Sequence, residues 1–328
     1  MKILVTGCVG FIGYHTTREL IKRGHEVIGI DSMNNYYDIR LKHYRFEELI
    51  KLGLATNRFN FYERDITKDY QFTFILNEHK PDAIINLAAY AGVDNSIKNP
   101  KIYFKTNVQG TLNLLECCKE VGIKKFVQAS TSGIYAGQKT PFSEDLAVNV
   151  PISPYTASKK CAEVLGHPYS YLYDISFTAL RFFTVYGPAG RPDMSLFRFI
   201  KWIDEGTPIL LYGDGEQSRD FTYVDDIVDG IIRSLDLENK YEIINLGSDK
   251  PHKLNYVIKF IGEQLKKEVK YDRKEFLKTD IKSTWADISK ARKLLEWTPK
   301  MGLEEGIYNM IKWYLGNKAW AKDLKTGV

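Results

Sequence analysis

The sequence predicts an α/β protein with a doubly wound parallel sheet, helices on both faces of that sheet, and a second, smaller region. Three observations predict this class. The chain opens with a short apolar run that enters a glycine turn and then a helical pattern. Apolar runs and helical patterns then alternate, as they do in parallel sheets. The 328 residues exceed one typical domain and suit a large α/β unit with a smaller partner region.

The first strand and helix carry a nucleotide-binding pattern. Residues 2–6 are apolar, as expected for a buried parallel strand, and Gly7, Gly10 and Gly13 follow at intervals of three. Glycines let the backbone approach a pyrophosphate, and the helix start at Phe11 and Ile12 offers free N–H groups and a positive dipole end. Gly7, Gly10, Phe11, Ile12 and Gly13 are therefore expected to bind a dinucleotide in a Rossmann-type domain.

The second strand supplies the acid that this pattern requires. Residues 25–30 form another apolar run, which Asp31 closes 18 residues after Gly13. A carboxylate at that distance holds the hydroxyls of the adenosine ribose and repels a 2′-phosphate. Ser32 and Met33 supply no arginine to attract such a phosphate. The sequence thus favours NAD over NADP as the cofactor.

Five further apolar runs predict the rest of the sheet. They cover residues 59–65, 83–89, 125–130, 177–182 and 241–246, with the clearest helical pattern at 104–121. Ligands of such sheets lie outside the carboxyl ends of the strands. The groups at those ends are therefore candidate site residues: Asp65 and its neighbour Ile66, Leu87, Ala88, Ala89, Ser130, Thr131, Ser132 and Thr184.

Tyr155 and Lys159 form a candidate catalytic pair. Positions four apart share one face of a helix, so the ammonium group can lie near the phenol. A nearby cation stabilises the phenolate and lowers its pKa, which makes the phenol an effective base for a hydroxyl proton. A pair on a helix surface with no catalytic role is the alternative, and the upstream nucleotide pattern favours the catalytic interpretation.

Composition excludes several other classes of function. The net charge of +5 is mild, and no basic block with interleaved aromatic residues indicates a nucleic-acid partner. The four cysteines have neither Cys-x-x-Cys spacing nor a nearby histidine, so we expect reduced thiols, no metal and a cytoplasmic location. No apolar run reaches the roughly 18 residues that span a membrane, and the opening residues are expected to be the first strand, not a signal peptide.

Several short runs, in a fixed order, resemble the extended short-chain dehydrogenase/reductase superfamily and its NAD-dependent epimerase/dehydratase family. They are the glycine turn at 6–13, residues 87–89, Asn107 within 107–111, residues 130–132 and the pair Tyr155 and Lys159. Two more runs, residues 31–37 and 181–194, resemble the nucleotide-sugar 4-epimerases that act on UDP-glucuronate. The resemblance extends over nearly the whole chain.

The resemblance implies an isomerase mechanism. Tyr155, as phenolate, would take the proton of the sugar 4-hydroxyl while the C4 hydride passes to NAD⁺. Lys159 would hold the nicotinamide ribose, and Thr131 would hydrogen-bond the same hydroxyl and relay its proton. The 4-keto sugar would turn over and take the hydride back on its other face, so the cofactor is regenerated. Asn35 and Asn107 are further cofactor-binding residues that the resemblance implies.

Residues 132 and 133 favour epimerisation over the related reactions. The 4,6-dehydratases of this family carry Asp and Glu directly after the threonine, and UDP-xylose synthases carry Glu two residues after it. Here Ser132 and Gly133 occupy those places. Because neither has a carboxyl group, elimination and decarboxylation both lack a group that their chemistry uses.

The resemblance also implies a UDP-sugar as substrate. Thr184 stands where 4-epimerases of neutral hexoses have Asn, and Arg191 is a candidate for reaching the same region, with a purely structural loop arginine as the equal alternative. Ser132 is a further sugar-binding candidate. Arg219 is similar to the arginine that pairs with the diphosphate, and Asp280 is similar to the acid that holds the uridine ribose.

Five positions depart from the family pattern. Asn86 replaces a histidine, Tyr90 a glutamine, Asp94 an arginine, Gly133 a serine and Ala136 a glycine. These changes leave the redox residues intact. They leave the sugar open between glucuronate, a neutral hexose and an amino sugar.

The resemblance implies two interleaved domains and a homodimer. The NAD-binding domain would cover 1–180 with a returning strand near 241–247, and the substrate domain 181–328. Helices near 103–120 and 155–172 would form the dimer contact. A net dehydrogenase or reductase of sugar nucleotides and a non-catalytic nucleotide sensor stay open as alternatives.

Overall fold

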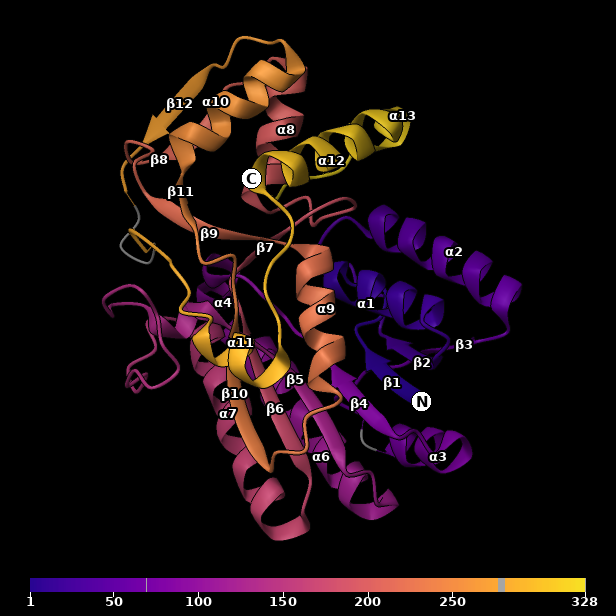
Figure 1. Cartoon of the computed structure of the whole chain (residues 1–328). Helices are drawn as coiled ribbons and strands as arrows, with labels where there is room; N and C mark the ends of the chain where they lie inside the picture. The colour runs from indigo at the N-terminus through magenta and orange to yellow at the C-terminus, as the bar shows by residue number, and fades with distance from the viewer. Residues whose placement is uncertain (69, 277–280, 328) are drawn as a thin grey trace.

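The computed structural model describes residues 1–68, 70–276 and 281–327 (Figure 1). Within these residues the principal sheet has seven strands: β1 (Lys2–Thr6), β2 (Glu26–Asp31), β3 (Phe59–Glu63), β4 (Ala83–Asn86), β5 (Lys125–Thr131), β6 (Ser176–Phe182) and β10 (Tyr241–Leu246). Each corresponds to an apolar run in the sequence.

The strands of this sheet are all parallel, in the order β10-β6-β5-β4-β1-β2-β3. The chain runs outward from β1 through β2 to β3, then returns to the other side of β1 with β4. This reversal between β1 and β4 is the topological switch point, where open α/β sheets bind their ligands. The predicted doubly wound parallel sheet is confirmed.

Helices cover both faces of the sheet. They are α1 (Phe11–Lys22), α2 (Ile39–Thr56) and α9 (Val224–Ser234) on one face, and α3 (Tyr70–His79), α6 (Gly110–Val121) and α7 (Pro154–Tyr173) on the other. Successive residues of β1 point to opposite faces, so Ile3 and Val5 join one buried apolar cluster while Leu4 joins the other. Burial on both faces explains why the strands are apolar throughout.

The helical pattern at 104–121 is not one regular helix. It contains a π-helical turn, η1 (Phe104–Gln109), between the short helix α5 (Pro100–Tyr103) and α6, and α4 (Val93–Lys98) precedes them. A 3₁₀ turn, η2 (Ser132–Tyr135), likewise follows β5. Periodicity does not distinguish a π turn from an α-helix, and π turns are frequent at functional sites.

The smaller region lies at the carboxyl ends of the principal strands (Figure 1). It has one three-stranded sheet and one two-stranded sheet among the described residues: β7 (Thr184–Tyr186), β9 (Ser218–Tyr223) and β11 (Pro251–Lys253), and β8 (Ile209–Tyr212) with β12 (Tyr271–Lys274). Its helices are α8 (Ser195–Glu205), α10 (Leu254–Leu265), α12 (Leu303–Gly316) and α13 (Lys318–Ala321), while α11 (Ser289–Leu295) lies near β10.

The chain crosses between the two regions more than once. After β9 it returns to form α9, which packs on α1, and then β10, which pairs with β6. The strand β10 thus returns to the principal sheet, and the division into two interleaved domains that the resemblance implies stays a prediction. Across the part of the chain that is described, no helix has the length and apolar character needed to cross a bilayer.

Candidate active site

The glycine turn between β1 and α1 leaves no room for side chains. Gly7 has φ +66°, and a Cβ there would lie 2.8 Å from the Ala88 nitrogen. A Cβ on Gly13 would lie 1.9 Å from the Gly7 carbonyl oxygen. Gly10 begins the helix without a side-chain cap, so the N–H groups of the first turn stay available. This turn has the backbone and the helix end that a pyrophosphate requires.

A cleft of about 540 Å³ opens beside this turn at the switch point. The predicted cofactor residues that line it are Gly7, Gly10, Asp31, Asp65, Ile66, Leu87, Ala88 and Ala89. They come from the carboxyl ends of β1, β2, β3 and β4. The cleft and the close-packed glycine turn together fit a dinucleotide.

A buried lysine that the sequence analysis missed faces Asp31. Lys42, on α2, donates to Asp31 Oδ1 over 3.2 Å and to Asn34 Oδ1 over 3.2 Å. Both charged side chains are only 6% exposed. A contact across eleven residues has no local signature, so only the docking of α2 against the end of β2 reveals it.

Two residues that were predicted to bind the cofactor, Asn35 and Asn107, are not among the residues that line the cleft. Asn35 is exposed, and its neighbour Asn34 lines the cleft. Asn107 is buried in the π turn, where it exchanges two hydrogen bonds of 2.9 Å with the backbone of Tyr90 and donates another of 2.9 Å to Ser158. Asn107 therefore fixes the loop after β4 against the helix that carries Lys159.

The start of α7 positions the candidate base. Ser153 caps the helix, accepting from Thr156 N over 3.2 Å, and Thr156 Oγ1 accepts in return from Ser153 N. Tyr155 therefore lies in the first turn, and Thr131 at the end of β5 is near enough to lower the pKa of its phenol. The structure brings together the two residues that the resemblance pairs.

The electrostatics of Tyr155 differ from the sequence-based expectation. We expected Lys159 to lower the pKa of the phenol, but burial raises it, because burial penalises the charged phenolate. The nearby Thr131 and the positive charge of Arg191 oppose that rise. The predicted lowering by Lys159 is therefore wrong for this structure, and Arg191 is the cation that favours the phenolate.

Lys159 lies one turn further along the same helix and is 3% exposed. Burial lowers the pKa of its ammonium group to about 8, and the charge of Glu163 opposes this fall. No hydrogen bond or ion pair joins this ammonium group to another residue within 1–68, 70–276 and 281–327. A buried ammonium with open donor positions fits the hydroxyls of a ribose.

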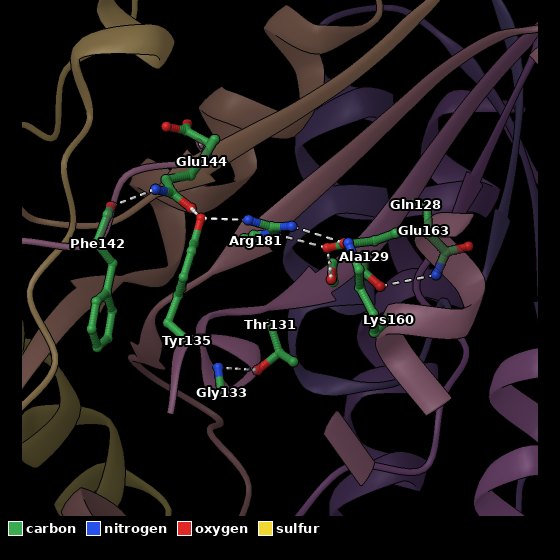
Figure 2. Close-up of polar contacts among 12 residues, drawn as sticks. Gln128, Ala129, Thr131, Gly133, Tyr135, Phe142, Glu144, Lys160, Glu163 and Arg181 are labelled. Atoms are coloured by element: carbon green, nitrogen blue, oxygen red, sulfur yellow. Dashed lines mark hydrogen bonds and ion pairs between the residues drawn. The ribbon is translucent and has the colours of Figure 1, made fainter. Parts of the chain in front are cut away.

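Figure 2 shows a buried polar network near Thr131, one of the candidate catalytic residues. Arg181 on β6 lies between Glu163 of α7 and Tyr135 of η2, and it donates to both. Ser130, which directly precedes Thr131, donates to Glu163. The network thus joins the strand end that carries Thr131 to the helix that carries Tyr155 and Lys159.

Arg191 lies in a tyrosine-rich corner of the site. Its guanidinium group is 5.4 Å from the ring centroid of Tyr36 and donates to both carboxylate oxygens of Asp193, over 3.0 and 2.6 Å. Tyr36 shares a 2.9 Å hydrogen bond with Tyr103, whose ring is 6.1 Å from that of Tyr155. These tyrosines were not predicted as site residues, because aromatic residues that far apart in sequence give no local signal.

The structure describes four of the five residues that were predicted to bind the substrate. Thr184 and Arg191 line one small pocket between β7 and the loop that precedes α8. Ser132 is buried at the start of η2, and Arg219 lies on β9, where it donates to the Ser218 carbonyl over 2.8 Å. Asp280 lies outside the described residues.

The structure explains two departures from the family pattern. Asn86 is fully bonded inside the sheet, to Thr6, Thr111 and Gln128 over 2.6 to 3.1 Å. A Cβ on Gly133 would lie 3.0 Å from the Thr156 methyl group, so a side chain there would press on the start of α7. These two substitutions are therefore compatible with the geometry around Thr131.

Asp94 lies in the first turn of α4, where its negative charge acts on Arg198 of α8. The Asp94 carboxylate, which replaces the arginine of the family pattern, thus has a cation in its neighbourhood.

With this geometry in place, a family model gives the classification. The model of the NAD dependent epimerase/dehydratase family matches residues 3–247. The chain belongs to this family. Membership in this epimerase/dehydratase family confirms the resemblance seen in the sequence, and NAD is the cofactor for which the family is named.

Individual relatives narrow the comparison within this epimerase/dehydratase family. The chain is 50% identical to UDP-glucuronate 4-epimerase of Thermodesulfobacterium geofontis, over 98% of this chain and 99% of the relative. It superimposes with a TM-score of 0.90 on UDP-glucuronic acid 4-epimerase from Bacillus cereus in complex with UDP-glucuronic acid and NAD, at 35% identity, covering 97% and 100% of the two chains.

A relative with a different substrate is also similar. UDP-glucose 4-epimerase of Thermotoga maritima, solved with UDP-glucose, gives a TM-score of 0.87 at 30% identity, over 97% of this chain and 100% of that one. Fold alone therefore does not separate the two sugars.

Proposed function

We propose that the protein is an NAD-dependent 4-epimerase that interconverts UDP-glucuronate and UDP-galacturonate. The observation that carries the proposal is the 50% identity to a UDP-glucuronate 4-epimerase over nearly the full length of both chains. The influence of Thr131 on the phenol of Tyr155, which places the two side chains near each other, supports the same chemistry.

In the proposed reaction, Tyr155 takes the proton of the 4-hydroxyl, and Thr131 forms a hydrogen bond with that same hydroxyl. Arg191 supplies the positive charge that favours the phenolate in a partly buried position. Bound NAD⁺ supplies a hydride acceptor that can return the hydride. Once the 4-keto sugar has turned its other face, Tyr155 gives the proton back.

The cofactor would lie along the carboxyl edge of the sheet. The first-turn N–H groups of α1 would bind its pyrophosphate, and Asp31 would accept from the adenosine ribose hydroxyls. The Lys159 ammonium group, buried and open to further hydrogen bonds, would bind the nicotinamide ribose. Arg219 on β9 would pair with the diphosphate of the UDP-sugar.

Incubation of the protein with four UDP-sugars, each alone, tests the proposal. The four are UDP-glucuronate, UDP-galacturonate, UDP-glucose and UDP-galactose, and chromatography resolves the products. We expect interconversion of the two uronates without added NAD and without accumulation of NADH. Interconversion of the neutral hexoses alone would establish the UDP-glucose 4-epimerase alternative, and NADH formed in proportion to substrate would establish a net dehydrogenase.

We also propose that the protein acts in the cytoplasm. Its four cysteines are free thiols, and three of them are buried. Thiols persist unpaired in reducing compartments, which supports this location.

A homodimer through α7 is part of the proposal. The outer face of this helix exposes Val164, Tyr171 and Leu172, at 56%, 77% and 61%. Val164 and Tyr171 are seven residues apart, which is close to two helical turns, and Leu172 directly follows Tyr171. The three side chains therefore lie on one side of the helix. Apolar side chains that are exposed together on one helix support a subunit contact at this place.

A further inference from the structure

Glu163 is the most completely bonded carboxylate near the candidate active site. Its side chain is 0% exposed. Oε1 accepts from Ser130 Oγ over 2.7 Å and from Arg181 Nε over 2.9 Å, and Oε2 accepts from Arg181 Nη2 over 2.9 Å and from Lys160 over 3.2 Å. Such a carboxylate is held in one place by four charged or polar donors.

These contacts join three elements that carry catalytic or supporting residues. Glu163 lies on α7 two turns after Tyr155, Ser130 lies on β5 next to Thr131, and Arg181 lies on β6. Arg181 also donates to Tyr135 OH over 2.6 Å. The position of Thr131 relative to Tyr155 is therefore set through Glu163 as well as through the packing of the helix on the sheet (Figure 2).

Glu163 also lies four residues after Lys159, which places both on one face of α7. The titratable and charged groups of the elements packed around this part of the helix are Tyr155, Lys160 and Glu163 on α7, Tyr103 on α5, Tyr135 in η2, Arg181 on β6 and Tyr241 on β10. Among them Glu163 is the group whose charge raises the pKa of Lys159 against the effect of burial.

We propose that Glu163 is a positioning residue of the active site: it fixes the strand end that carries Thr131 against α7, and its negative charge keeps Lys159 in the ammonium form. The charge effect rests on the four-residue spacing of Lys159 and Glu163 on α7 and on the direction in which Glu163 shifts the pKa of Lys159, whereas the effect on Thr131 rests on the proposed epimerase function.

NMR titration of Lys159 tests the charge effect without any need for turnover. The protein is labelled with ¹³C at lysine Cε, and the Lys159 signal is assigned from its loss in Lys159→Met. We expect a midpoint near pH 8 in the native protein. In Glu163→Gln, which keeps the size of the side chain and removes its charge, we expect the midpoint to fall by about one pH unit.

Two further variants control this measurement. Glu116→Gln neutralises another carboxylate in contact with α7, through Tyr169, and we expect it to leave the Lys159 midpoint unchanged. The double variant Glu163→Gln with Arg181→Gln leaves no lone buried charge, so it is the substitute if Glu163→Gln does not fold. It removes a negative and a positive charge together, so a smaller fall in the same direction is expected. An unchanged midpoint in the folded variant would overturn the charge effect.

Ser130→Ala tests the effect on Thr131. It removes the contact to the strand end and keeps the Glu163 charge, so we expect an unchanged Lys159 midpoint and a kcat for uronate interconversion about tenfold lower at similar KM. Native kcat with unchanged KM would overturn this half of the proposal. If the native protein itself turned over no UDP-sugar, the proposed function would fail, and the NMR titration would still decide the charge effect.

Discussion

Lys159 combines burial with a charge that the proposed reaction uses. At 3% exposure its ammonium group has lost most of its hydration, which lowers its pKa to about 8. The group is therefore charged below that pH and neutral above it, whereas an exposed lysine stays charged to about pH 10. A lysine that titrates near neutral pH gives the site a sensitivity to alkaline conditions.

This titration predicts a pH dependence of epimerisation. Because the neutral amine no longer binds a ribose as a cation, kcat/KM should fall as the pH rises through about 8. Initial rates between pH 6 and 9.5, with substrate well below KM, measure it. In Lys159→Arg, whose side chain stays charged, the fall near pH 8 should disappear even though overall activity is lower. A fall that persists in Lys159→Arg would assign the titration to another group.

Tyr155→Phe should remove the base and leave the fold intact. We expect loss of turnover by a factor of about 10² to 10⁴, because general base catalysis contributes about that much. Conversion of UDP-glucuronate is measured over long incubations, together with the thermal midpoint. Tyr169→Phe, on the same helix but bonded to Glu116 outside the site, is the matched control and should retain activity. Equal activity of Tyr155→Phe and Tyr169→Phe would contradict the mechanism.

Cofactor choice depends on two buried charges. Asp31 opposes a 2′-phosphate, but Lys42 lies 3.2 Å from it and would attract one if the acid were neutralised. Asp31→Asn should therefore reduce the preference for NADH over NADPH by at least about tenfold, since removing a repulsion of this kind is worth about 1.4 kcal/mol or more. Fluorescence titration of the two reduced cofactors measures it. Adding Lys42→Met should abolish the gain in NADPH binding, and an unaltered preference in Asp31→Asn would argue against any role of Lys42.

At the level of single residues, local patterns predicted the catalytic and glycine positions because each motif is contiguous or repeats within one helical turn. Lys42, Tyr36 and Tyr103 were missed, since each joins the site through contacts between distant segments. The pKa direction of Tyr155 was also predicted wrongly, because sequence spacing shows a nearby cation but not the burial that outweighs it.

At the level of elements, the turn between β1 and α1 is the most tightly constrained part of the fold. The helix approaches the turn so closely that a methyl group on Gly13 would meet the Gly7 carbonyl oxygen at 1.9 Å. That oxygen is backbone and accepts from Gly10 N over 2.9 Å, so it has little freedom to move. Accommodating a side chain would require α1 to shift away from the sheet.

Gly13→Ala should therefore lower stability and weaken NAD binding together. We expect a decrease in the free energy of unfolding of about 1–3 kcal/mol, as for other overpacked sites. Urea unfolding and NADH titration measure the two effects. Gly302→Ala is the control, because Gly302 has φ −68° and a Cβ there would meet no atom within 4 Å, so its effect should stay within about 0.5 kcal/mol. Equal stability of both variants would show that α1 relaxes freely.

All seven predicted strands exist, since a strand buried on both faces must be apolar along its length. The helix at 104–121 was predicted as regular, and the π turn within it was not foreseen, because a single turn is too short to show a period of its own in the sequence. The capping box at Ser153 also went unnoticed, although Ser153 and Pro154 are a recognisable helix start.

At the level of the whole molecule, a buried arginine connects the two regions. Arg45 on α2 is 0% exposed and donates to the carbonyl oxygens of Val9 in the glycine turn and Ala189 in the loop after β7. One cation therefore joins the glycine turn to the loop after β7. Such long-range contacts were beyond the sequence analysis, whereas the interleaving itself followed from the family resemblance.

The proposed dimer is tested by making its contact polar. Val164→Glu with Leu172→Glu places two carboxylates on the exposed side of α7, where they would be buried without partners in a dimer. We expect the native protein to sediment as a dimer and the double variant as a monomer with an unchanged circular dichroism spectrum. Substitution of Tyr256 and Tyr308 by Glu, at exposed positions on α10 and α12, is the control. A native monomer would refute the proposal.

The return of the chain to form β10 has a consequence for its synthesis on the ribosome. β6 pairs with β5 on one side and with β10 on the other, yet β10 is made only after residues 183–240 have been added. Throughout that interval the nascent chain carries β6 as an open apolar edge, and such edges are sites of mispairing and aggregation. The NAD-binding sheet is thus complete only when about three quarters of the polypeptide has emerged, so a product truncated near residue 182 would depend on chaperones that shield this edge.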